Sequence, residues 1–423
     1  MYKGIVTKNY LNIRVSGPNR DHPPLKQALQ KGTEIEIKNA LYGEEIDGEN
    51  LWYKLTSNHY VWAGYVFTEN DIEIQKKRII FTADDYGVVD SIDSGIIKGV
   101  KDGLLNSVTC FTNYGENGEK ALKKLRKLEM LQASYQLELG VHLTITSGSP
   151  LLGRGNVPLL CRDKKDRLPG YKESDFCDYT KLKRHYEKLD DSQKANFIIQ
   201  LEAELRKQIE VFLNPQDGGN PILLSHLTSH HNSLLFREEF FEVMLKLSKE
   251  YKVRIQNDSL PIPLRSLHNI PGWKDNGFYT VKGKILFPKK SINKLKRKMR
   301  QASNSLVKTP SLLHSNHYGP PPFILKKNID KLVEKKKNKS NGMLKDLING
   351  DFTTMEFLLH LRSGKLYQNH DDYEKNETRP TGYAGINPTA FDSRTAELTA
   401  FLSRFARPSS LPPEIEMGTW ANL

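Results

Sequence analysis

The pattern of apolar and polar positions changes near residue 75, and the two parts of the chain predict different secondary structure. Up to about residue 70, short apolar runs that alternate or are rich in aromatic residues are separated by glycine and proline turns, a pattern typical of β-strands. We expect strands in four runs: Leu11–Val15, 33–40 (TEIEIKNA), Leu51–Leu55 and Tyr60–Val66. Four or five such strands make a small all-β barrel.

The second part alternates between apolar runs and stretches in which apolar residues have helical spacing. The run Arg78–Gly87 (RIIFTADDYG) is followed by a helical pattern at Ser91–Gly103 and by another apolar run at Leu105–Asn113. A strand, a helix and a strand in about 35 residues indicate a parallel sheet. Further strands are expected at Gln136–Ile145, Pro221–His231, Tyr251–Asn257 and Thr353–Leu361, and further helices at Ser192–Phe212, Arg237–Lys249 and Asp392–Phe405. The charged segment Asp71–Lys77 is expected to be a linker.

Composition narrows the class of protein. With 38% hydrophobic and 27% charged residues in 423, the chain can bury a globular core. The three cysteines lack C-x-x-C spacing, so we expect a reducing compartment and no disulfide framework. No signal peptide is visible at the N-terminus, and no run of about 18 apolar residues occurs. We therefore expect a cytoplasmic protein without a membrane span, with export by another route left open.

The formal net charge of +13 raises the question of nucleic-acid binding. Most of the excess lies in two lysine-rich stretches, Lys289–Arg300 and Lys326–Lys345. Their lysines alternate with apolar residues at helical spacing, as on the solvent side of amphipathic helices. Aromatic residues for base stacking are nearly absent there, so we expect no nucleic-acid partner.

Polar clusters follow or end four of the expected strands. They are Asp84 and Asp85; His142; His226, His230 and His231; and Glu356 and His360. The carboxyl ends of parallel strands meet on one face, which carries the active site in such folds. One Asp and two His form a catalytic metal set that leaves a position for water, and a dication lowers the pKa of that water. Each cluster alone also fits a turn, a core histidine or a capping loop.

The motifs that carry these residues resemble those of the YdjC-type carbohydrate deacetylases, which include chitooligosaccharide deacetylases. They are TADDYG, LGVHLTITSGSPLL, SHLTSHHN, MEFLLHL and DSRTAELTAFL. The resemblance runs from about Arg78 to Phe405, with the lysine-rich stretches and the segment around Pro320–Pro322 as insertions. It implies a modified (β/α) barrel over 78–410 that removes N-acetyl groups from amino-sugar (GlcNAc-containing) oligosaccharides or glycans through a metal-activated water.

The resemblance also implies roles for individual residues. Asp85, His142 and His230 would hold one divalent metal ion, magnesium or zinc, and Asp84 would be the general base. Glu356 and His360 match a late motif of the family, in which a histidine protonates the leaving amine or stabilises the oxyanion.

Two positions depart from the family pattern. Thr228 stands where the family has Asp or Asn two residues before the metal histidine, so we expect it to make His230 less basic than a carboxylate would. Leu361 replaces a proline after His360, which changes the turn there and the aim of that histidine.

Residues 1–70 resemble a bacterial SH3-like domain over Leu11 to Val66. Such modules commonly bind peptidoglycan or another cell-envelope ligand, whereas Trp52, Tyr53 and Trp62 could equally just fill its core. Two other functions therefore stay open beside deacetylation. One is an envelope-glycan binding protein with an inactive barrel, and the other is a metal-dependent hydrolase of a different amide.

Overall fold

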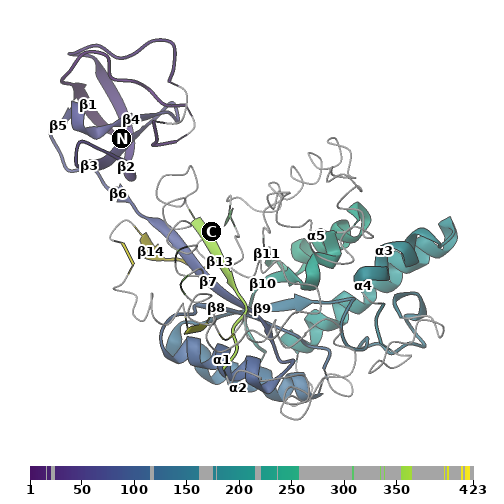
Figure 1. The fold of residues 1–423 in the computed structure, drawn as a ribbon. Helices are drawn as coiled ribbons and strands as arrows, with labels where there is room; N and C mark the ends of the chain where they lie inside the picture. Colours follow the sequence, from purple (N-terminus) through teal and green to yellow (C-terminus); the bar gives the residue numbers. More distant parts are fainter. Residues whose placement is uncertain are drawn as a thin grey trace.

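The part of the chain that the structure describes forms two β-sheets (Figure 1), and each has its own buried apolar core. The computed structural model describes residues 1–256 apart from 16, 21–23, 115–118, 162–174, 178, 215–220 and 236, and then 307–308, 334, 338, 354–363, 395, 398–399, 411–412 and 415–419. The expected helices at Lys289–Arg300, Lys326–Lys345 and Asp392–Phe405 lie wholly or largely outside the described residues, as does the segment around Pro320–Pro322.

The first sheet lies within residues 2–75. Its strands are β1 (Tyr2–Val6), β2 (Glu34–Ile46), β3 (Glu49–Leu55), β4 (Tyr60–Trp62), β5 (Val66–Thr68) and β6 (Ile74–Gln75). They lie in the order β4-β3-β2-β1-β5, and β6 pairs with β2. Trp52, Tyr53 and Trp62 belong to the core of this sheet. Both indole N–H groups donate to backbone carbonyls, Trp52 to Glu44 (2.9 Å) and Trp62 to Glu49 (3.0 Å).

Three predictions for this part were wrong in detail. Leu11–Val15 forms only isolated bridges, one of them to Pro24, which has no N–H to continue a ladder. The run Tyr60–Val66 is interrupted by a 3-10 turn at Ala63–Tyr65. The expected linker Asp71–Lys77 contains β6, which pairs in parallel with β2. The division at residues 70 and 78 and the SH3-like character stay predictions.

The second sheet is entirely parallel, as predicted. Its strands are β7 (Lys77–Tyr86), β8 (Ser107–Cys110), β9 (Glu138–Leu143), β10 (Leu224–Ser229), β11 (Arg254–Ile255), β12 (Val307–Lys308), β13 (Thr354–Leu359) and β14 (Ile415–Met417). Their order is β11-β10-β9-β8-β7-β13-β12, and β14 pairs with the start of β7. Ile79, Phe81 and Ala83 of β7 belong to the main core, so the alternate residues Ile80, Thr82 and Asp84 face the opposite side of the sheet.

Helices cover the core side of this sheet (Figure 1). They are α1 (Asp90–Lys101), α2 (Glu119–Tyr135), α3 (Tyr179–Glu187), α4 (Asp191–Leu213) and α5 (Glu238–Tyr251). A capping box between Asp190 and Gln193 fixes the start of α4 by pairing backbone N–H groups that lack helical partners. Among the residues that the structure describes, no helix combines the length and apolar character needed to cross a membrane.

One hydrogen bond shows that the parallel sheet is curled. Gln256, directly after β11, donates its Nε2 to Oε1 of Glu356 on β13 at 2.8 Å. The strands β10, β9, β8 and β7 lie between β11 and β13, and in a flat sheet this would separate the two strands by about 24 Å. The sheet therefore curves like a half-barrel, with the side chains opposite the helices pointing inward. This confirms a mixed α/β, barrel-like architecture for the second part of the chain.

Candidate metal centre

An irregularity in β7 brings two adjacent aspartates to the same place. The pairing of β7 with β8 shifts register between Ala83 and Tyr86, and Asp85 has a φ of 71°. Adjacent residues of a regular strand point to opposite faces, but a bulge rotates one of them. Both carboxylates therefore face His142, with Asp85 Oδ1 3.3 Å from Nε2 and Asp84 Oδ2 3.9 Å from Nδ1.

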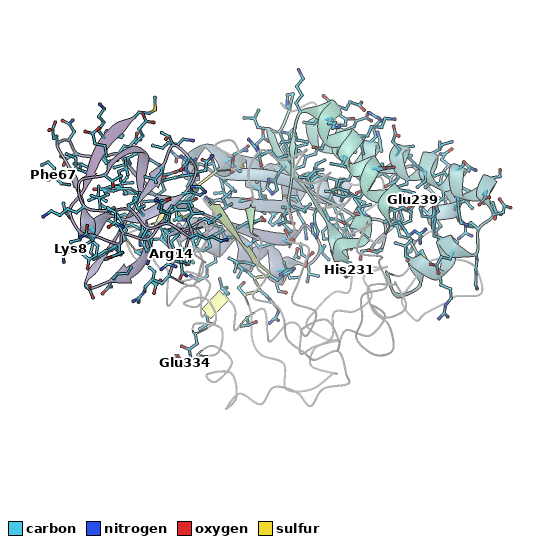
Figure 2. The ribbon with its side chains drawn as sticks, turned by 90° about the horizontal axis from the view of Figure 1, so that it is seen from above. Lys8, Arg14, Phe67, His231, Glu239 and Glu334 are labelled. Carbon is cyan, nitrogen blue, oxygen red and sulfur yellow. The ribbon has the colours of Figure 1, made fainter. Side chains whose placement is uncertain are left out.

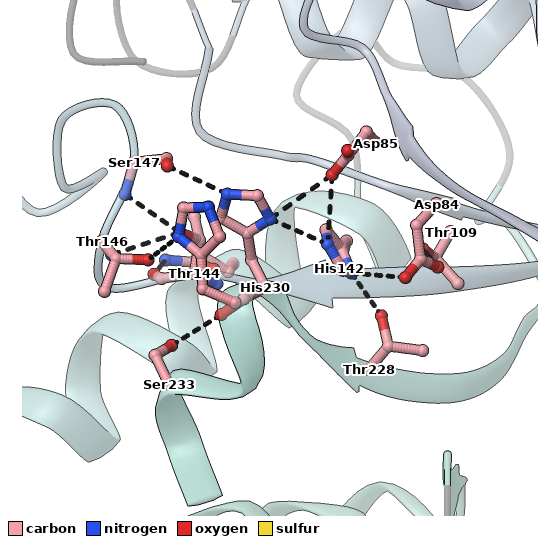
Figure 3. Close-up of polar contacts among 12 residues, drawn as sticks. Asp84, Asp85, Thr109, His142, Thr144, Thr146, Ser147, Thr228, His230 and Ser233 are labelled. Atoms are coloured by element: carbon pink, nitrogen blue, oxygen red, sulfur yellow. Dashed lines mark hydrogen bonds and ion pairs between the residues drawn. The ribbon is translucent and has the colours of Figure 1, made fainter. Parts of the chain in front are cut away.

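Asp85, His142 and His230 form a close triangle of potential ligand atoms (Figure 3). His142 comes from β9, and His230 begins the 3-10 helix His230–Leu235 directly after β10. Oδ1 of Asp85 lies 3.3 Å from Nδ1 of His230, and Nδ1 of His230 lies 3.0 Å from Nε2 of His142. All three residues are buried. The structure thus brings together the three metal ligands expected from the sequence.

The triangle fits a small divalent ion. Ligands bound at about 2.1 Å in tetrahedral or octahedral geometry lie about 3.0–3.4 Å from one another. The three measured separations of 3.0 and 3.3 Å fall in this range. One carboxylate and two imidazoles suit zinc and other first-row dications, and the carboxylate also suits magnesium.

Each histidine makes a hydrogen bond through the ring nitrogen that faces away from the triangle. Nδ1 of His142 lies 2.5 Å from Oγ1 of Thr228, and Nε2 of His230 lies 3.0 Å from Oγ of Ser147. A histidine that binds a metal through one nitrogen carries its proton on the other. In that state His142 donates Nδ1–H to Thr228, and His230 donates Nε2–H to Ser147.

The partner of Thr228 differs from the one we expected. Thr228 was expected to modify His230, but the register of β9 and β10 pairs Thr228 directly with His142. Neighbouring residues at the same level of a parallel pair point to the same face of the sheet, so the hydroxyl meets His142. The structure therefore places the Thr228 hydroxyl against His142 instead of His230, and an effect of Thr228 on basicity stays a prediction.

Asp84 lies on the far side of His142 from the triangle. It is 3% exposed, and its Oδ1 accepts a hydrogen bond of 2.6 Å from Oγ1 of Thr109. Its Oδ2 faces the Nδ1 edge of His142 at 3.9 Å. From this position the carboxylate faces the imidazole of His142, and its role as general base stays a prediction.

Glu356 lies on β13, and His360 directly follows that strand. Glu356 pairs with Ile80 of β7, and Leu359 with Ala83, which places His360 level with Asp84 at the carboxyl end. Glu356 lies four residues earlier, about 13 Å back along the strand, where it accepts the hydrogen bond from Gln256. The catalytic roles of both residues stay predictions. Leu361, the departure after His360, is fully buried in the main core.

The site also contains residues that the sequence analysis did not single out. The ring of Phe111 packs edge-on against those of His142 and His230, with centroids 5.0 and 4.8 Å apart. It therefore places apolar atoms beside the two histidines. Thr109 and Ser147 bind Asp84 and His230. Alternation along Leu105–Asn113 could have placed Thr109 on the polar face, but no sequence signal marks Ser147.

A second polar layer lies one step below the triangle. His226 on β10 is fully buried, and burial, with a smaller effect of His142, lowers its pKa to about 3. Its ring lies 2.7 Å from Oγ of Ser225 and 3.4 Å from Oγ of Ser107. A Cβ at Gly140 would lie 2.7 Å from this ring. Glycine in the middle of β9 thus makes room for the imidazole.

Comparison with known proteins identifies relatives for the second part of the chain. Residues 78–404 match the family model of YdjC-like protein. A carbohydrate deacetylase of Clostridium beijerinckii is 28% identical over 56% of this chain and 83% of its own length. Carbohydrate deacetylases of Vibrio parahaemolyticus (27% identical) and Listeria monocytogenes (30%) align with 43% of this chain, which covers only 60% and 61% of their lengths.

A solved structure from Enterococcus faecalis aligns with 82% of this chain and 98% of its own, at 16% identity and a TM-score of 0.47. That likeness is too low to bear on function. The family match, in contrast, spans most of the chain and includes the whole triangle of ligand residues. The chain therefore belongs to the YdjC-like protein family.

Proposed function

We propose that the chain is a metal-dependent carbohydrate N-deacetylase, a hydrolase that removes N-acetyl groups from GlcNAc-containing oligosaccharides or glycans. The observation that carries the proposal is the triangle of Asp85, His142 and His230, whose atoms are spaced as the ligands of one divalent ion. Membership of the YdjC-like family and the carbohydrate deacetylases among the relatives support the reaction.

In this proposal Asp85, His142 and His230 would hold a divalent ion, zinc or magnesium, which would lower the pKa of a bound water and polarise the amide carbonyl. Thr228 and Ser147 keep the outer ring nitrogens of His142 and His230 protonated, so that the inner nitrogens offer lone pairs. Asp84 takes a proton from the attacking water. His360, directly after the adjacent strand β13, gives a proton to the leaving amine or stabilises the oxyanion.

His142→Ala and His230→Ala test the proposal, because each removes one corner of the triangle. We expect both variants to lose tightly bound metal and to release no acetate from N-acetylated chitooligosaccharides. His59→Ala is the matched control, since the backbone carbonyl of His59 pairs with Leu55 in the first sheet, and it should retain both properties. Unchanged acetate release by either triangle variant would refute the assignment.

For residues 1–70 we propose an SH3-like β module that binds a cell-envelope glycan. Support comes from the small, mostly antiparallel sheet with its own aromatic core. The isolated module should bind cell-wall material. If it does so while the full chain releases no acetate, the alternative of a glycan-binding protein with an inactive barrel would be favoured.

A further inference from the structure

We infer that helix α4 positions the metal centre through the loop that follows β9, with Gln208 and Glu204 as positioning residues. This loop, residues 144–160, is called the β9 loop below. The inference rests on the proposed metal centre and concerns residues that lie outside it. It is carried by a continuous series of hydrogen bonds from α4 to His230.

Three polar side chains form a buried stripe along α4. Gln200, Glu204 and Gln208 are spaced four residues apart, so they share one face of the helix. They are 7%, 0% and 1% exposed, respectively. Burying such groups costs free energy unless they are hydrogen-bonded, and here each of them binds the backbone of the β9 loop.

Gln208 binds the first residue of the β9 loop at both of its backbone groups. Its Oε1 accepts from the N–H of Thr144 at 3.0 Å, and its Nε2 donates to the carbonyl of Thr144 at 2.8 Å. Thr144 is only two residues beyond the ligand His142. The Nε2 group also donates to Oε1 of Glu204 at 2.9 Å, which links neighbouring members of the stripe.

Glu204 and Gln200 hold the rest of the β9 loop. Glu204 accepts from the N–H of Leu151 at 3.0 Å and from that of Leu152 at 3.1 Å, one at each carboxylate oxygen. Gln200 accepts from the N–H of Leu159 at 2.9 Å. The stripe therefore fixes the beginning, middle and end of the β9 loop.

The β9 loop in turn touches the metal centre. The hydroxyl of Thr144 accepts from the N–H groups of Thr146 (3.3 Å) and Ser147 (3.2 Å). The side chains of these two residues face the histidines, with Ser147 Oγ 3.0 Å from Nε2 of His230 and Thr146 Oγ1 3.1 Å from Nδ1 of His231 (Figure 3). A shift of Thr144 would move Ser147 and with it the hydrogen bond that orients His230.

Binding of Co²⁺ to the full chain tests this inference, because its visible absorption reports ligand geometry as well as affinity. Gln208→Met keeps the length of the side chain but removes both bonds to Thr144. Glu204→Gln removes one acceptor and is the milder change if Gln208→Met does not fold. Glu210→Gln is the control, with the same chemical change on a different face of α4.

We expect Gln208→Met and Glu204→Gln to weaken Co²⁺ binding by about 3- to 10-fold, below the 10- to 100-fold typical of direct partners of metal ligands, and to change the absorption spectrum. Glu210→Gln should match the wild type. Amide hydrogen exchange should accelerate at Thr144 in Gln208→Met and at Leu152 in Glu204→Gln. Unchanged affinity and spectrum in folded Gln208→Met or Glu204→Gln would overturn the inference.

A double variant separates positioning from a general loss of stability. If α4 acts through the β9 loop, the losses of Co²⁺ affinity in Gln208→Met and Ser147→Ala share one route and are not additive. The double variant should then lose much less than the product of the single losses, whereas independent effects that multiply would overturn the inference. Failure of the wild type to bind Co²⁺ would instead count against the proposed function.

Discussion

At the scale of single residues, the two neighbouring carboxylates of the site have different environments. Asp85 Oδ1 faces two imidazole nitrogens at 3.3 Å, as a metal ligand would. Asp84 is bound to Thr109 and faces the outer edge of His142. One substitution can therefore distinguish a general base from a residue that orients His142.

Asp84→Asn keeps the shape of the side chain and removes its charge. If Asp84 is the general base, we expect kcat to fall by about 10²- to 10⁴-fold with metal affinity nearly unchanged. Metal affinity is measured by titration and kcat by acetate release. Asp102→Asn makes the same chemical change at an exposed ion pair with Lys98, and this control should leave kcat and metal affinity unchanged. A 10- to 100-fold loss of metal affinity, as is typical for partners of metal ligands, would show that Asp84 mainly orients His142.

Glu204 gives a pH-dependent prediction at the same scale. Burial raises its pKa to about 7 from the ordinary value of 4.5. Between these two values the folded state keeps a proton that the unfolded chain releases, so the free energy of unfolding falls as pH rises from 4.5 to 7. Glu204→Gln cannot titrate. Between pH 5 and pH 8 its free energy of unfolding should therefore rise by about 2.5 kcal/mol relative to that of the wild type.

Urea unfolding at a series of pH values measures this difference. The relative stability of Glu210→Gln should not show the same change over that window. A difference between Glu204→Gln and wild type that stays constant from pH 5 to pH 8 would contradict the raised pKa.

At the scale of secondary-structure elements, the contacts at the site depend on strand register. The register of β9 and β10 pairs Thr228 with His142 at the proposed metal site, and His226 with Gly140 two residues earlier on each strand. In both pairs a residue with a small side chain, or with none, lies opposite an imidazole ring. Gly140 leaves the space that the ring of His226 occupies.

Gly140→Ala tests the packing of β9 against β10. The added Cβ would lie 2.7 Å from the ring of His226 and 2.8 Å from its backbone oxygen, so the strands must shift. We expect a loss of about 1–3 kcal/mol in the free energy of unfolding, measured with urea. Gly155→Ala, where the Cβ meets nothing within 4 Å, should change stability little. Equal stability of the two variants would show that β9 and β10 accommodate the methyl group.

The sequence predicts where the helices and strands lie better than it predicts the pairing and contacts between strands. Strong periodicity located β7, α1, β9, α4, β10 and β13 to within a few residues, because their apolar faces are packed in the core. The expectation at Leu11–Val15 failed, since alternation alone does not supply a pairing partner. The bulge at Asp84 and Asp85 and the bond from Thr228 to His142 depend on the register between strands distant in sequence, which local patterns do not determine.

At the scale of the whole molecule, the curled parallel sheet brings together residues that are far apart in the sequence. Asp85 and His230 lie on β7 and directly after β10, with β8 and β9 between them, yet their ligand atoms are 3.3 Å apart. The first sheet has a separate core, and Figure 2 shows Lys8, Arg14 and Phe67 on one side of the view and His231 and Glu239 on the other. Hydrolysis and any envelope binding can therefore be measured separately.

Acetate release from N-acetylated chitooligosaccharides by the purified full chain is the most direct test of the proposed function. Protein treated with a chelator should release none, and restoring zinc or another divalent ion should return the activity and indicate which ion is used. Absence of release with every divalent ion, on folded protein that binds metal, would contradict deacetylation and favour a different amide substrate.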